Sequence, residues 1–114
     1  MSLEVSIRTV GEIHVAAARG RIVLGEGTDH LHRELRGLID AGWRKILINL
    51  AEVQQIDSTG ISTIVRNCTA LSRAGGTLKL VCPPGRVRDS LNLIRIADAI
   101  PTFDDEASAL ASFG

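Results

Sequence analysis

The residues best able to do chemistry form the consecutive group Asp57-Ser58-Thr59-Gly60, which holds one carboxyl and two hydroxyls. An apolar run at 46–50 precedes this group, and a segment with apolar residues at helical spacing follows it at 61–71. The group therefore lies where a buried strand gives way to a helix. In α/β proteins, ligands bind in crevices beyond the carboxyl ends of strands.

Helix capping explains part of this pattern. The first backbone N–H groups of a helix have no partners within the helix, and the side chain of Asp57 or Ser58 can accept a hydrogen bond from them. Capping accounts less well for a second hydroxyl and for Gly60. Because glycine in a first turn costs up to about 1 kcal/mol relative to alanine, Gly60 indicates that something approaches the backbone closely. On spacing alone, a cap and a functional site both remain open.

A catalytic role for Ser58 lacks a partner in the sequence. A serine nucleophile needs a base, and His14, His30 and His32 have no recognisable triad context. His30 and His32 are two residues apart, so they point to different sides of a helix, which is poor geometry for a shared metal ion. The sequence also has no phosphate-binding GxxxxGK[ST] loop. We therefore predict no enzymatic activity, no cofactor and no metal site.

Composition indicates one globular domain over residues 1–114, with 45% apolar and 23% charged residues. The longest apolar runs are far short of the roughly 20 residues that cross a bilayer. The N-terminus has no basic and apolar regions typical of a secretory signal. Cys68 and Cys82 lie inside apolar patterns without CxxC spacing, which argues against a disulfide framework or a zinc site. These features predict a cytoplasmic location without membrane contact.

The net charge is zero, but the charges are unevenly distributed. Residues 58–88 carry five basic side chains and no acidic one, whereas 89–114 carry one basic and five acidic. Solvated helix faces are the simpler interpretation, and a partner-binding patch is the alternative. Nucleic-acid binding would require more positive charge, with stacking aromatics for a single strand. We therefore expect no direct contact with nucleic acid.

Turn residues and apolar periodicity predict the order β-β-α-β-α-β-α-(β)-α. A half-buried strand at 3–10 and a second strand at 13–17 form a hairpin around Gly11-Glu12. A short β-branched run at 45–50 suits a central strand, and 77–82 alternates as another. Helices of this length between strands favour parallel neighbours, so the sheet is expected to be mixed.

Four helices are expected between and after the strands. The first has Thr28 as its N-cap and ends at Gly42. The second covers 61–71 and stops at Gly75-Gly76. The third is short and is expected to place Val87, Leu91 and Ile94 on the core. Asp104 is the expected cap of the last helix, with Leu110 and Phe113 as its apolar contacts.

Taken together, the stretches ILINLAEVQQIDSTGISTIV and AGGTLKLVCPPGRVRDSLNLIRIADAIPTFDDEASAL resemble the STAS domain family, specifically bacterial anti-sigma factor antagonists. The resemblance covers nearly the whole chain from Gly20 onward. Its most specific part is the apolar strand, the D-S-[ST]-G motif and the amphipathic helix that follows. The resemblance implies a single α/β domain, with a mixed sheet of four or five strands packed with about four helices.

The resemblance also implies a function. Members of the family bind an anti-sigma factor that is also a serine/threonine kinase of the histidine-kinase ATPase fold, and this binding releases the sigma factor. The kinase phosphorylates the first hydroxyl of the motif, here Ser58, and a phosphatase resets it. Asp57, Thr59 and Gly60 would frame the acceptor. Phosphoregulated members often carry an acidic turn after the second strand, where this chain reads GRIVLGEG at 20–27.

The physical chemistry of the motif is compatible with this switch. Phosphate adds about −1.5 to −2 charge near pH 7, and a helix N-terminus favours an anion. The sequence therefore predicts a non-catalytic binding module that phosphorylation of Ser58 switches off. Two alternatives stay open: a STAS scaffold in which Ser58 caps the helix and is never modified, and a small α/β enzyme or nucleotide-binding protein with Ser58 as nucleophile.

Overall fold

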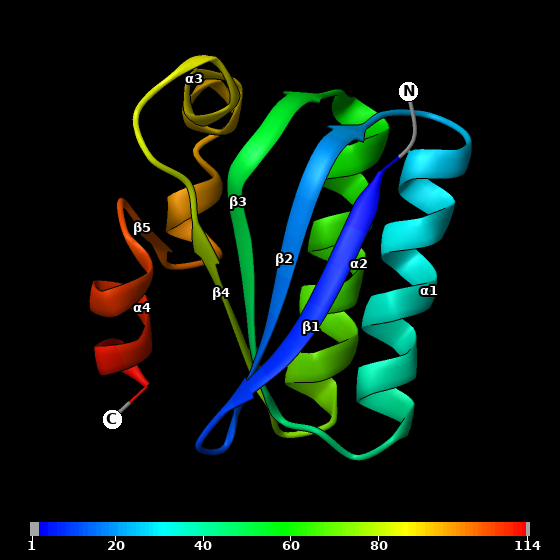
Figure 1. Ribbon diagram of the computed structural model, residues 1–114, viewed down its shortest axis with the longest axis vertical. Helices are drawn as coiled ribbons and strands as arrows, with labels where there is room; N and C mark the ends of the chain where they lie inside the picture. The colour runs from blue at the N-terminus through cyan, green and yellow to red at the C-terminus, as the bar shows by residue number, and fades with distance from the viewer. Residues whose placement is uncertain (1–2, 114) are drawn as a thin grey trace.

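The computed structural model describes residues 3–113, and its elements follow the predicted order (Figure 1). One short 3-10 helix, labelled η1, was not predicted. The elements are β1 (Glu4–Val10), β2 (Ile13–Ile22), α1 (Glu26–Asp40), β3 (Lys45–Ile56), α2 (Ser58–Arg73), β4 (Thr77–Val81), α3 (Arg86–Leu93), η1 (Ile96–Asp98), β5 (Thr102–Phe103) and α4 (Glu106–Ser112).

The five strands form one sheet in the order β1-β2-β3-β4-β5. The β1–β2 hairpin is antiparallel, and the other three pairings are parallel. This arrangement confirms the predicted mixed sheet of an α/β fold, with β3 at its centre. β3 also runs six residues beyond the predicted end at 50, as far as Ile56, and this extension carries the chain to the motif.

Helices cover both faces of the sheet, but unequally. α1 and α2 lie side by side against one face, whereas α4 lies beside β4 and β5 (Figure 1). Because successive strand residues point to opposite faces, Ile46 and Ile48 belong to the main core with the helices α1 and α2, and Leu47 belongs to a smaller cluster with Ala109 of α4. The larger core therefore lies beneath the helix that begins at the motif.

Two predictions about β1 and α1 are wrong. β1 is mostly exposed instead of half-buried, because it is an edge strand with a neighbour on one side only. α1 begins at Glu26 with Gly25 at the N-cap position. Thr28 lies in the first turn, where its hydroxyl donates to the Gly25 carbonyl at 3.1 Å.

Two predictions about the C-terminal helices also need correction. The cap of α4 is Asp105, whose carboxylate accepts from the Ser108 N–H at 2.7 Å. Asp104 instead accepts from Arg88 at 2.8 Å. In α3, Val87 and Leu91 are buried as predicted, but Ile94 follows the helix and is 53% exposed. It lies past the last turn, so the helical spacing no longer directs it to the core.

The cysteines occupy apolar surroundings, as expected. Cys82 is buried, Cys68 is half-buried against the main core, and both are free thiols. Within residues 3–113, none of the helices combines the length and the apolar character that crossing a membrane requires.

Candidate functional site

The motif lies at the junction between β3 and α2. β3 ends at Ile56, Asp57 has an extended backbone, and Ser58 is the first residue of α2. Asp57 is the N-cap, since its side chain accepts a hydrogen bond from the Gly60 N–H. The structure thus decides between the two candidate caps and leaves the Ser58 hydroxyl free of that role.

The Asp57 carboxylate binds three donors from two segments. Its Oδ1 accepts from the Gly60 N–H at 2.9 Å and from the Thr59 hydroxyl at 2.6 Å. Its Oδ2 accepts from the Leu24 N–H at 2.9 Å. Leu24 belongs to the β2–α1 connection, so one carboxylate joins the start of α2 to the loop before α1.

These donors also control the ionisation of Asp57. Burial on its own would raise the pKa of this carboxyl, but the hydrogen bonds from Thr59, Leu24 and Gly60 outweigh it. The pKa of Asp57 therefore lies below its ordinary value, because these bonds favour the charged form. At neutral pH the motif carries one fixed negative charge that is already well hydrogen-bonded.

The two hydroxyls of the motif have different surroundings. The Thr59 hydroxyl is half-buried and donates to Asp57. Ser58 is exposed, and its hydroxyl makes no hydrogen bond to any of residues 3–113. An incoming reagent can therefore reach the Ser58 Oγ without breaking an existing bond, whereas Thr59 would first have to release Asp57.

Gly60 is required by the packing of the protein itself. A Cβ atom at this position would lie 2.4 Å from the Ile22 carbonyl oxygen and 2.8 Å from the Ile56 side chain. The close approach that the glycine indicated is thus made by the end of β2. Gly60 lets the first turn of α2 sit against that strand.

An open depression lies beside Ser58, between the first turns of α1 and α2. Sequence reasoning missed most of its lining, although the spacing of Ser58, Ser62 and Arg66 places them on one face of α2. Leu24, at the rim, is 76% exposed. The lining residues are Leu24, Thr28, Asp29, Ser58, Thr59, Ser62, Thr63 and Arg66.

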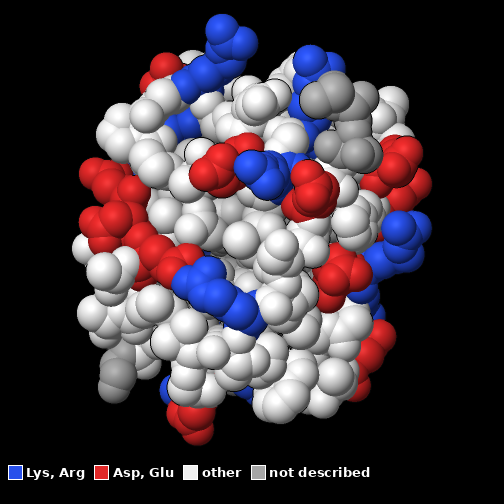
Figure 2. Space-filling model, in the orientation of Figure 1, with Lys and Arg blue, Asp and Glu red and all other residues white. Residues whose placement is uncertain are grey.

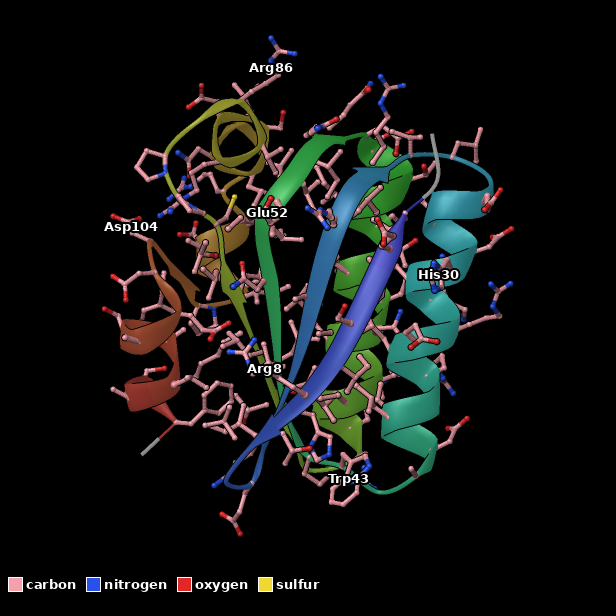
Figure 3. All side chains as sticks on the ribbon, in the orientation of Figure 1. Arg8, His30, Trp43, Glu52, Arg86 and Asp104 are labelled. Carbon is pink, nitrogen blue, oxygen red and sulfur yellow. The ribbon has the colours of Figure 1, made fainter. Side chains whose placement is uncertain are left out.

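The three histidines have separate structural environments. His14 is buried and stacks on Trp43, with ring centroids 4.1 Å apart. His30 lies on α1 (Figure 3), and its Nδ1 is 2.9 Å from the Leu3 carbonyl oxygen. His32 Nδ1 accepts from Asn67 Nδ2 at 3.1 Å. Within the described chain, no three His, Cys, Asp or Glu side chains are grouped to hold a metal ion.

The acidic C-terminal segment has structural partners. Acidic side chains gather along one edge of the face in Figure 2, where Figure 3 labels Asp104. Glu106 pairs with Arg8 and also accepts from Asn49 at 3.0 Å. Burial would raise the pKa of Glu106, but these two bonds and the Arg8 charge lower it. These contacts of Glu106 with β1 and β3 hold α4 on the sheet.

The chain matches one protein family over most of its length. The model of the STAS domain family matches residues 5–109. The chain belongs to the STAS domain family. A protein of Thermotoga neapolitana with the provisional name of anti-sigma factor antagonist is 32% identical over 72 residues, which are 63% of this chain and 64% of that protein. The aligned part is thus just under two thirds of that relative's length.

Solved structures share the fold of this STAS domain. The crystal structure of a Thermotoga maritima protein with the same provisional name has a TM-score of 0.87 at 21% identity and covers 95% of this chain and 92% of its own. The structure of the Bacillus cell fate determinant SpoIIAA in its phosphorylated form has a TM-score of 0.74 at 16% identity. The match covers 97% of this chain and 100% of SpoIIAA. At these identities the likeness establishes the fold.

Proposed function

We propose that this STAS domain is an anti-sigma factor antagonist, a non-catalytic module that binds an anti-sigma factor and is switched off by phosphorylation of Ser58. The partner is an anti-sigma factor that is also a serine kinase of the histidine-kinase ATPase fold, and a phosphatase restores the active form. The observation that carries this proposal is the exposed Ser58 hydroxyl at the first position of α2, which makes no hydrogen bond to the described part of the chain. The names of the relatives support the same function.

In the proposed reaction, the STAS domain supplies only the nucleophile. The Ser58 Oγ attacks the γ-phosphorus of ATP held by the kinase, and an O–P bond forms. The bond from that phosphorus to the β,γ-bridging oxygen breaks, ADP leaves, and the hydroxyl proton passes to a base of the kinase. Asp57 does not serve as this base, since its carboxylate is engaged by Leu24, Thr59 and Gly60.

The position of Ser58 lets the charge change without unfolding the domain. A phosphate adds about −1.5 to −2 charge near pH 7, and the free N–H groups and dipole of a helix N-terminus favour an anion. In the complex the same charge would lose its water against a partner surface that offers no prepared counter-charge. An unpaired charge buried in an interface costs about 2–5 kcal/mol, which corresponds to a loss of affinity of roughly thirty-fold or more.

The test uses the kinase that co-purifies with this chain from its native cell. With ATP and magnesium, phosphopeptide mapping should find one phosphate, on Ser58. Thr59→Ala should still be phosphorylated, and Ser58→Ala should not. Phosphate that moves to Thr59 or Ser62 in the Ser58→Ala variant would contradict the assignment. No phosphate at all, with unchanged partner binding, would favour the unmodified STAS scaffold.

A further inference from the structure

One basic side chain, that of Arg66, lines the open depression beside Ser58. Among the described residues that line it, Arg66 carries the one positive charge and Asp29 the one negative charge. Arg66 is exposed and forms no ion pair within residues 3–113, whereas five other basic side chains of the chain do. Its charge is therefore available to a group that is added nearby.

The geometry of α2 directs Arg66 toward Ser58. The two residues are eight positions apart, which is about 12 Å along a helix axis, and Ser62 lies between them on the same face. Because helical side chains lean toward the N-terminus, Arg66 extends back over Ser62. The Ser58 side chain leans the same way, so the long, flexible arginine side chain has to close most of the distance to a phosphate on Ser58.

We propose that Arg66 is the counter-charge of the phosphorylated state and pairs with the phosphate on Ser58 within the same chain. This inference rests on the proposed phosphorylation of Ser58. Two carboxylates lie near Ser58: Asp29 of α1 lines the same depression, and Asp57 is the neighbouring residue in the chain. The fixed charge of Asp57 is satisfied by its three donors, so Arg66 is the residue left to offset the repulsion between the new dianion and these acids.

The pairing can be tested without the kinase by placing phosphoserine at position 58 during translation with an expanded genetic code. The second ionisation of the phosphate, ordinarily near pH 6, is followed by its ³¹P signal. Arg66 stabilises the dianion, so removing it should raise the titration midpoint. In Arg66→Gln we expect a rise of about 0.5 pH unit at low salt, the size expected for one charge a few ångströms away in water.

Arg73→Gln is the matched control, because Arg73 lies in the last turn of the same helix and outside the lining of the depression. Its midpoint should equal that of the unsubstituted phosphoprotein, and Arg66→Lys should recover part of the shift. Arg21, which is exposed near the end of β2, is the other basic side chain that could pair with the phosphate.

An unchanged midpoint in Arg66→Gln, or a rise in Arg21→Gln instead, would overturn the proposal. Because Arg66 is exposed, the unphosphorylated Arg66→Gln variant should melt at the same temperature as wild type, which confirms that it folds. Failure of this titration would leave the kinase mapping of Ser58 unaffected, and failure of the mapping would show independently that the proposed switch is absent.

Discussion

Replacing Asp57 by alanine is expected to destabilise the domain more than the loss of an ordinary helix cap does. Its carboxylate accepts from the Gly60 N–H within α2 and from the Leu24 N–H, 33 residues earlier in the chain. Alanine removes both bonds at once, and the Thr59 hydroxyl also loses its acceptor. The start of α2 and the β2–α1 connection are then no longer joined through this carboxylate.

The size of the effect follows from these contacts. Loss of an Asp N-cap typically costs about 1 kcal/mol. Loss of the partner of the Leu24 N–H adds about 0.5–1 kcal/mol, at the lower end for a hydrogen bond because that group is exposed to water. The free energy of unfolding should therefore fall by about 2 kcal/mol. For a chain of this length, that corresponds to a melting temperature lower by roughly 8 °C.

Urea unfolding followed by circular dichroism measures this loss directly. Asp57→Asn should lose about 1 kcal/mol, since its amide oxygen can still accept from Gly60 while its NH₂ group faces the Leu24 N–H donor. The control is Asp29→Asn, which changes an exposed first-turn carboxyl of α1 and should cost about 0.5 kcal/mol or less. A loss below about 0.5 kcal/mol in Asp57→Ala, or equal losses in the two asparagine variants, would refute this account.

Four further predictions concern the same site. Gly60→Ala should lower stability by about 1–3 kcal/mol in urea unfolding despite alanine's better helix propensity, since the added Cβ meets the immobile Ile22 carbonyl oxygen; a stabilised variant would contradict the packing. The pKa of Asp57 is lowered in the folded state, so its stabilisation is present above the ordinary value near 3.9 and is lost as pH falls through the lower folded value; acid titration of stability should be shallower in Asp57→Asn than in wild type. Ser58→Asp should bind the purified anti-sigma factor at least thirty-fold more weakly, and Ser58→Ala should bind like wild type; calorimetry that finds equal affinities would reject the charge switch. The isolated chain should show no calorimetric binding of magnesium–ATP, and a micromolar site with stoichiometry near one would revive the nucleotide-binding alternative.

The sequence by itself determined the elements and their order. Three local patterns indicate these elements: the alternation at 3–10, the β-branched run at 45–50 and the apolar spacing of 61–71. Each pattern can be recognised from consecutive residues, without knowing which segments pack against them. The same reasoning placed the motif at a strand-to-helix junction and limited the cap to Asp57 or Ser58, since only the residues just before the first turn can reach its N–H groups.

Errors in the sequence analysis arose where a local signal allowed more than one answer. Asp104 and Asp105 are equally good caps by type, and the position of Arg88 assigns Asp104 to an ion pair. The alternation of β1 correctly indicated a strand, but its exposure depended on its place at the sheet edge.

Only the tertiary structure decided which hydroxyl is free. Asp57 is held by the Leu24 N–H from a distant loop and takes the Thr59 hydroxyl, which leaves Ser58 available. Glycine is likewise required at position 60 because the Ile22 carbonyl at the end of β2 leaves no room for a side chain. The contacts of Leu24 with Asp57 and of Ile22 with Gly60 join residues far apart in the chain, and they form only after the parallel pairing of β2 with β3 brings the two strand ends together.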